Sequence, residues 1–353
     1  QAVEALIEEF LDGVPNKELY DGRTSVYDLA RQSFSGSIRL LEHFRCVDEI
    51  IAFSNSLCYQ GEIQPLRESS RLPIKPPTAV VRVENGVCTK KVNIKEAEMI
   101  ASLIMSCCEQ PEYEEASFGV ISLVGEEQAL AVDKVLMKNM ELTEYQERRI
   151  VCGNAAQFQG DERDVIFLSL VEDCPDGEQL ALRTAEAFVK RFNVAASRAR
   201  DQMWVIHSLD PDNDLKEGDL RRDLIEHCQD PQKTMKKLSE ASVEERSIPT
   251  DDPEYRYQYR IRRGLEKAGY RVITDQEVGN YHLDLVVEGK GGRVAITCDG
   301  ANEHPPERLA RSLEREAVLE RLGWRFLRAR ASSYYLDPEK TVDWVIERLE
   351  EME

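Results

Sequence analysis

Two short segments carry the side chains best suited to binding a phosphorylated ligand. The first, residues 157–164, is a polar turn that contains Gly160 and Glu162 and leads into an apolar run. Glycine lets the backbone approach an anion closely, and a carboxylate can accept hydrogen bonds from sugar hydroxyls. The second, residues 191–200, places three arginines around a small apolar stretch. Arginine stays protonated and matches phosphate oxygens with a planar fork. Together they predict one side of a nucleoside-triphosphate site.

Taken singly, each of these residues also has a plain structural interpretation. Gly160 is the residue type that many tight turns require, and Arg198 and Arg200 could be solvated residues at a helix end. The combination of the two segments, rather than any one residue, separates a binding site from this alternative.

The surrounding pattern predicts an α/β fold that would position both segments. Apolar runs typical of buried strands lie at residues 79–83, 118–124, 149–152, 165–170 and 203–207. Helical periodicity separates them at residues 47–59, 94–108, 126–140 and 184–198. Alternating strands and helices indicate a parallel sheet with helices on both faces. We therefore predict a first domain at residues 1–210, followed by a polar linker with helices at residues 211–252.

A second, smaller α/β domain is predicted for residues 253–353. Helices are expected at residues 255–268, 306–322 and 338–349, and strands at residues 270–274, 282–287, 293–298 and 325–329. Within it, Asp284 stands in an apolar strand. That position is costly for a carboxylate unless it is paired or binds a metal, although alternation can also place an Asp on a solvent face.

Charge and composition limit the class of protein. The net charge is −20, whereas residues 254–353 carry 17 Lys and Arg against 19 Asp and Glu, about −2. Because polyanions bind basic surfaces, an indiscriminate nucleic-acid binder is disfavoured, and the C-terminal domain is the better place for a basic face. Nine cysteines without a C-x-x-C pair favour reduced thiols in a cytoplasm. No apolar run of about 18 residues and no signal peptide occur, so we expect no membrane partner.

The two opening segments closely resemble motifs V and VI of superfamily 1 helicases, in the branch typified by the RNA-surveillance helicases. That pattern is F-Q-G-x-E-x-D followed by R-L-N-V-A-x-T/S-R-A-R, with Phe192 replacing the leucine here. Residues 40–46 resemble the family's aromatic-Arg motif, and residues 93–97 and 119–122 with Gln128 resemble its motif IV region. The resemblance covers roughly residues 25–210 and implies a RecA-like domain.

This resemblance implies a role in ATP binding for several residues. Phe44 would stack on the adenine, Arg45 and Arg198 would reach the γ-phosphate, Gly160 would line the phosphates and Glu162 would hold the ribose, with Arg200 in the same set. Ser122 and Asn154 stand where the family contacts the nucleic-acid backbone. Ala156 departs from the acidic residue often found two positions before Phe158.

The other half of an ATP site is missing from the sequence. No G-x-x-x-x-G-K-[ST] occurs, and no Asp-Glu pair ends an apolar strand. Phosphoryl transfer in this family needs the P-loop Lys, Mg²⁺ and a carboxylate that positions water. The resemblance therefore implies a second RecA-like domain, whose partner is a missing first RecA-like domain. Because the chain also begins with Gln1 inside a helix-like stretch, we expect a piece of a longer protein that does not hydrolyse ATP alone.

The pattern around Asp284 resembles the nuclease-like domain often fused to such helicases, a PD-(D/E)XK branch related to very short patch repair endonucleases. It comprises Asp284, Thr297-x-Asp299-Gly300, His304 and a basic helix with Arg308, Arg311 and Arg315. The resemblance implies Asp284, Thr297 and Asp299 as Mg²⁺ ligands, His304 as general base and the three arginines as DNA contacts. Thr297 replaces the Glu of many relatives, and Gln258 replaces a second one.

Two functional interpretations follow. The first is the C-terminal part of an ATP-dependent DNA helicase, with a module that cuts or only grips single-stranded or duplex DNA. The second is a non-catalytic module that binds DNA or docks proteins, with a degenerate nuclease site. Metal binding at Asp284 distinguishes them.

Overall fold

The computed structural model describes residues 2–14, 40–174, 179–241, 253–279, 281–299 and 306–352, together with residues 17, 20, 27 and 30. Residues 1–41 and 42–353 form two separate compact units. In the first, Ala2–Phe10 form helix α1. The second unit contains every candidate residue of the sequence analysis.

A five-stranded parallel sheet organises the N-terminal part of the second unit. Its strands are β3 (Thr78–Arg82), β6 (Phe118–Ser122), β7 (Val151–Asn154), β8 (Arg163–Ser169) and β9 (Ala199–His207). They lie in the order β3-β9-β8-β6-β7, and every neighbouring pair is parallel. The predicted α/β class with a parallel sheet is confirmed, and the arrangement is consistent with a RecA-like fold.

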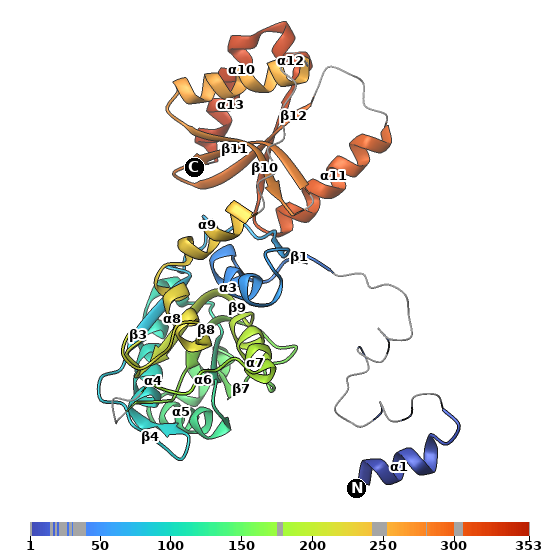
Figure 1. Ribbon diagram of the computed structural model, residues 1–353. Helices are drawn as coiled ribbons and strands as arrows, with labels where there is room; N and C mark the ends of the chain where they lie inside the picture. Colours follow the sequence, from blue (N-terminus) through green and yellow to red (C-terminus); the bar gives the residue numbers. More distant parts are fainter. Residues whose placement is uncertain are drawn as a thin grey trace. The chain divides into compact units, whose positions relative to one another are not determined.

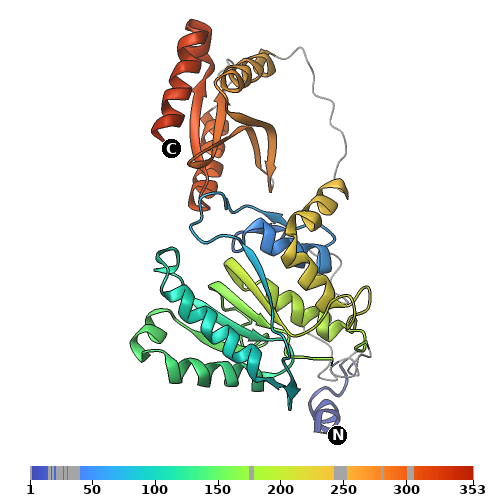
Figure 2. The same ribbon diagram turned by 90° about the vertical axis from the view of Figure 1, so that its left-hand side faces the viewer.

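Helices cover both faces of this sheet (Figures 1 and 2). On one face, α4 (Ile94–Cys108) and α5 (Glu126–Asn139) share a core with Phe167. On the other face, α3 (Asp48–Cys58), α7 (Glu186–Ala196) and α8 (Leu220–Gln229) share a core with Leu168. Consecutive strand residues thus enter opposite cores, as the two-residue period of a strand requires. Helix α9 (Pro231–Ala241) packs on α3.

Several short elements were not predicted. Strand β1 (Glu42–His43) pairs in parallel with β2 (Gln64–Pro65), and β4 (Cys88–Thr89) pairs with β5 (Val92–Asn93). A 3-10 turn, η2 (Pro111–Tyr113), and helix α6 (Leu142–Glu147) also form. The predicted strand start at residue 149 was wrong, because Arg149 adopts a φ of 47° in the turn that closes α6.

Residues 253–352 form the smaller domain with a four-stranded sheet. The elements are α10 (Pro253–Lys267), β10 (Arg271–Val278), β11 (Tyr281–Gly289), β12 (Gly292–Asp299), α11 (Pro306–Arg321), β13 (Arg325–Arg330), α12 (Ala331–Leu336) and α13 (Pro338–Glu351). Strands β10, β11 and β12 are antiparallel neighbours, and β13 joins β12 in parallel. The predicted hairpin is confirmed, and α12 is an additional helix.

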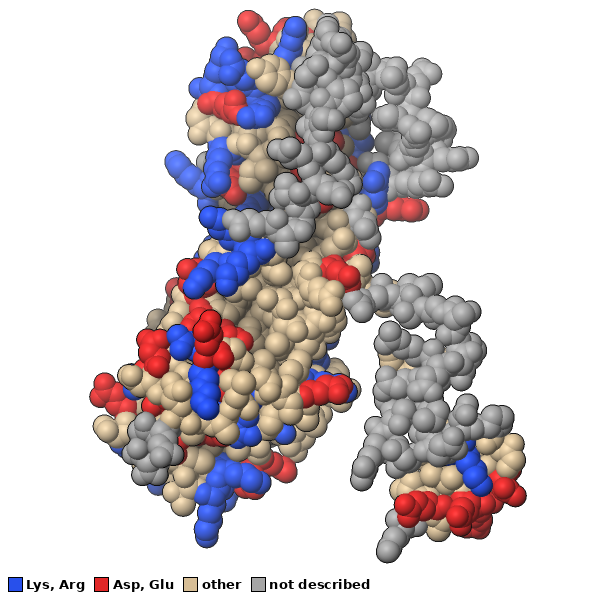
Figure 3. Space-filling model, in the orientation of Figure 1, with Lys and Arg blue, Asp and Glu red and all other residues tan. Residues whose placement is uncertain are grey.

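No helix in the described parts of the chain is both long and apolar enough to span a membrane. Basic and acidic side chains are mixed over the visible face of residues 42–241 (Figure 3).

Candidate functional site

Three segments that are distant in sequence meet at Arg45. Its Nε donates to Oε2 of Glu162, which stands before β8, and its Nη1 donates to the Ser197 carbonyl at the end of α7 over 3.3 Å. Arg45 itself follows β1. The aromatic-Arg motif and motifs V and VI of the sequence analysis therefore form one cluster.

Two further arginines complete this cluster, which we call the arginine cluster (Arg45, Arg198 and Arg200 around Glu162). Arg198 is half-buried, and its Nε donates to the Val194 carbonyl over 2.9 Å. Burial first, and the charge of Arg45 second, lower the pKa of Arg198. Arg200 Nε lies 3.8 Å from the second oxygen of Glu162. Arg200 Nη1 also lies 3.6 Å from Asp164. Two carboxylates thus face three guanidinium groups, which leaves a surplus of one positive charge.

The nearby histidine is buried beside these arginines. Burial first, and the charges of Arg45 and Arg198 after it, lower the pKa of His43 to about 4. The neutral ring accepts a hydrogen bond at Nε2 from the Cys46 backbone N–H over 3.0 Å. A cluster that disfavours a further cation is electrostatically suited to a polyanion such as a triphosphate.

Phe44 and Gly160 lie at the accessible edge of the cluster. Phe44 precedes Arg45 and is 47% exposed, so its ring is open to a stacking partner. Gly160 has a φ of 90°, and nothing lies within 4 Å of the position that a Cβ would occupy. Glu162, the expected ribose ligand, is engaged with arginines instead. Holding a ribose would require it to exchange those partners.

The expected nucleic-acid residues meet at the opposite ends of the strands. Ser122 and Asn154 are register partners at the carboxyl ends of β6 and β7. Both line a groove of about 360 Å³, whose other wall is α7. The α7 side chains in it are Ala187, Lys190, Arg191 and Val194. Sequence reasoning gave Lys190 no role and counted Arg191 with the phosphate-binding arginines, whereas the structure places Arg191 in the groove. The i, i+3, i+4, i+7 spacing of the four residues could have identified this face.

Hydrogen bonds fix the walls of this groove. Arg191 Nη1 donates to the Leu123 carbonyl over 2.9 Å, which ties α7 to the end of β6. Asn154 Oδ1 accepts the backbone N–H groups of Ala156 and Gln157. Ala156 lines the groove without a carboxylate. Lys190 is exposed and pairs with Glu186 at 2.6 Å, so a phosphate group of a nucleic acid would replace or share that partner.

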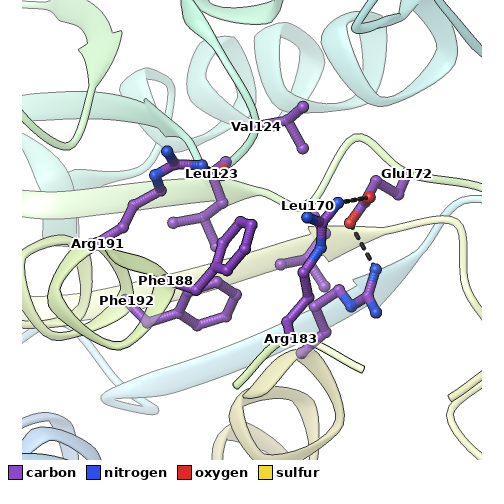
Figure 4. Close-up of a pocket in the computed structure, with 9 residues that line it drawn as sticks. Leu123, Val124, Leu170, Glu172, Arg183, Phe188, Arg191 and Phe192 are labelled. Atoms are coloured by element: carbon purple, nitrogen blue, oxygen red, sulfur yellow. Dashed lines mark hydrogen bonds and ion pairs between the residues drawn. The ribbon is translucent and has the colours of Figure 1, made fainter. Parts of the chain in front are cut away.

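A second, smaller pocket adjoins the groove and shares Arg191 and Val124 with it (Figure 4). Its volume is about 200 Å³. The Phe188 ring lies 4.4 Å from the Arg183 guanidinium and 5.3 Å from that of Arg191. Glu172 pairs with Arg183 at 2.5 Å and with Arg221 at 2.6 Å. These contacts hold the N-terminal half of α7 against the sheet.

In the smaller domain, Asp284 and Glu316 each accept hydrogen bonds from protein groups. Asp284 Oδ2 accepts the Cys298 backbone N–H over 2.7 Å. Thr297 Oγ1 donates to Glu316 Oε1 over 3.1 Å, and Arg328 donates to the same oxygen over 2.5 Å. Glu316, from α11, was missed because nothing in the sequence links it to β12.

Much of the expected nuclease site lies outside the described side chains. Asp299 ends β12, and Arg308 and Arg311 belong to α11, but their side chains are not described; His304 lies outside the described residues altogether. Arg315 is exposed on α11. Among the described residues, no three His, Cys, Asp or Glu side chains are grouped to hold a metal. Since Arg328 neutralises Glu316, the described donors do not form a Mg²⁺ site by themselves.

Comparisons with known proteins match both domains. Residues 257–349 match the REase_MTES_1575 family, whereas no curated protein matches the chain. Among solved structures, the chain is similar to the C-terminal domain of a possible DNA helicase from Lactobacillus plantarum WCFS1. That alignment has 11% identity and a TM-score of 0.30, and it covers 49% of this chain and 90% of the other. Residues 23–210, more than half of the 353, match the family described as an AAA domain, AAA_12, and the chain therefore belongs to that family.

Proposed function

We propose that residues 42–241 are the second RecA-like half of an ATP-dependent superfamily 1 DNA helicase. The observation that carries the proposal is that α7 joins two candidate sites. Val194 lines the groove, and its carbonyl accepts the hydrogen bond from Arg198 in the arginine cluster. A shift of Arg198 toward a phosphate would therefore act directly on a wall of the groove.

In this proposal, Arg45 and Arg198 bind the γ-phosphate, and Phe44 stacks on the adenine. Their fork geometry and surplus charge suit a triphosphate. Glu162 exchanges its arginine partners for the ribose hydroxyls. The P-loop lysine and the Mg²⁺ ligands come from another RecA-like domain, because the sequence of this chain contains no P-loop. Mg²⁺ bound there would neutralise charge on the transferred phosphoryl group.

Nucleotide binding by this chain tests the proposal. The arginine cluster should bind a fluorescent ATP analogue weakly, as measured by anisotropy. Arg198→Ala should lower the affinity roughly tenfold or more, since a hydrogen bond to a charged group contributes about 1.5–3 kcal/mol. Equal affinities of the wild type and the variant would contradict the proposal. So would ATP hydrolysis by the chain alone, purified free of other helicases.

A second candidate function concerns the smaller domain. The match to REase_MTES_1575 and the place of Asp284, hydrogen-bonded across to β12, favour a module that contacts DNA. We propose that this domain binds DNA whether or not it cleaves it, and that cleavage requires Asp284 and Asp299 as metal ligands. The match to REase_MTES_1575 is also the reason to propose DNA rather than RNA as the nucleic acid.

A further inference from the structure

A short segment between α3 and β3 contacts both the arginine cluster and the smaller domain. We call residues 64–71 the bridging segment. Its first two residues form β2, which pairs with β1 directly before Phe44. The Leu66 backbone N–H donates to the His43 carbonyl over 3.0 Å. The segment is thus bonded to the chain that carries Arg45.

Arg67 connects this segment to the arginine cluster. Its Nη1 donates to the Arg45 carbonyl over 3.0 Å and to the Arg200 carbonyl over 2.8 Å. Its Nη2 lies 2.5 Å from Asp201, and the two side chains are only 12% and 15% exposed. A single guanidinium therefore holds the main chain at two of the three arginines.

The residues on either side of Arg67 contact the smaller domain. Leu66 is fully buried in a cluster with Val286 and Trp324, and the Trp324 indole N–H donates to the Leu66 carbonyl over 3.0 Å. The Glu68 backbone N–H donates to the Leu322 carbonyl over 3.1 Å. Leu66 therefore contacts the smaller domain, whereas Arg67 contacts the arginine cluster.

We propose that the smaller domain supports the bridging segment, and that Arg67 is the positioning residue through which this support sets the main chain of Arg45 and Arg200. The inference rests on the proposed function, because it takes Arg45 as a nucleotide-binding arginine. Coupling of this kind is reciprocal. Whatever displaces the arginine cluster must also act on the docking of the smaller domain, and the reverse holds.

Cys46 offers a reporter beside Arg45. The thiol is completely buried, and its Sγ lies 3.5 Å from the Ser197 carbonyl. Burial raises the pKa of the Cys46 thiol to about 12, so it reacts with an alkylating reagent only when this part of the chain opens. Cys228 and Cys298, buried in the larger and the smaller domain, report on unfolding of each.

Two glycines of the smaller domain provide a matched pair of variants. A Cβ at Gly279 would lie 2.2 Å from Leu66 Cδ2, whereas a Cβ at Gly269 would have nothing within 4 Å. Both have a positive φ, 63° and 92°, so alanine is strained at each position. Only Gly279→Ala disturbs the bridging segment. Trp324→Phe is a milder second variant that removes the hydrogen bond to the Leu66 carbonyl.

The experiment is a pulse of N-ethylmaleimide on the native full chain, with each cysteine quantified by mass spectrometry. Gly279→Ala should raise the alkylation rate of Cys46 roughly tenfold, and Trp324→Phe less, because local opening becomes easier. Gly269→Ala should leave Cys46 unchanged, and Cys228 and Cys298 should stay protected. In an Arg67→Ala background, Gly279→Ala should add no further increase.

Unchanged Cys46 labelling in both Gly279→Ala and Trp324→Phe would overturn the proposal. A full additional increase in the Arg67→Ala background would do the same, because the effect would then bypass Arg67. The assay contains no nucleotide and no DNA. A negative labelling result would therefore not contradict the proposed function. Likewise, a failure to bind nucleotide would not contradict the connection from the smaller domain through Arg67 to the arginine cluster.

Discussion

The arginine cluster and the Asp284 region use charge in opposite ways. In the cluster, Arg45 and Arg200 share the carboxylate of Glu162, Arg200 also pairs with Asp164, and Arg198 adds a further positive charge. Around Asp284, Glu316 is matched by Arg328 and Thr297. Surplus charge of one sign is typical of a site for a charged ligand, whereas matched charge is equally typical of a structural network. The arrangement of charge therefore supports a ligand site at the arginine cluster more strongly than at Asp284.

The largest expected effect concerns DNA cleavage by the smaller domain. If Asp284 is a metal ligand, Asp284→Ala should reduce plasmid cleavage in Mn²⁺ by at least about 100-fold, since even outer-shell losses cost 10–100-fold. Glu320→Gln, at an exposed position of α11, is the control and should retain cleavage. Equal cutting by the wild type and Asp284→Ala would exclude Asp284 as a metal ligand. The Asp284 region would then be a structural network only, in contrast to the arginine cluster.

The pH dependence of stability should reveal the burial of His43 beside the arginine cluster. The unfolded chain binds a proton on this histidine near pH 6.5, but the folded chain does so only near pH 4. The free energy of unfolding should therefore fall as the pH falls through this window, by about 2 kcal/mol between pH 7 and pH 5. Urea titrations of the wild type and His43→Gln measure the difference. A variant that loses as much stability as the wild type would contradict the assignment.

Glu162→Gln should strengthen binding of inorganic tripolyphosphate severalfold. Removing the shared carboxylate releases Arg45 from a competing partner and leaves Arg200 with Asp164 alone, an effect of about 1 kcal/mol for partly exposed pairs. Asp161→Asn is the control, because Asp161 pairs with Arg163 instead. Titration calorimetry compares the two variants. Weaker binding by Glu162→Gln would show that the carboxylate organises the arginines rather than competing with the anion.

The smallest effect is expected in the groove. Lys190→Ala should weaken single-stranded DNA binding about threefold and reduce the salt dependence by about one counterion. Lys138→Ala, on an exposed part of α5 away from the groove, should change neither. Anisotropy titrations at several salt concentrations measure both quantities. If the plots of log affinity against log salt concentration had the same slope for the wild type and Lys190→Ala, a phosphate contact at Lys190 would be excluded.

Local signals predicted the regular elements well. Helix α4 has the bounds that were predicted, because Asn93 caps it by accepting the Glu96 backbone N–H. Strand β8 follows from an apolar run, but β9 begins at Ala199, four residues before the predicted start, because residues 200–202 are polar. In contrast, β1 and β2 are two residues long and exist through their pairing with each other. Pairings between distant short segments leave no periodic trace in a sequence.

The candidate site divides in the same way. Motif resemblance identified Arg45, Glu162 and Arg198, and the structure brings them together. It could not reveal Arg67 or Glu316, because each owes its place to a partner on another element. The roles of the identified residues stay predictions until a ligand is bound.

The length of α7 has a consequence of its own. The helix runs from the groove to the arginine cluster in eleven residues, which at 1.5 Å per residue is about 16 Å. Inserting one residue before Val194 would rotate Lys190 by about 100° relative to Arg198 and turn it away from the groove. Substitutions along the outer face of α7 should therefore be tolerated, whereas any insertion or deletion within it should separate the two sites.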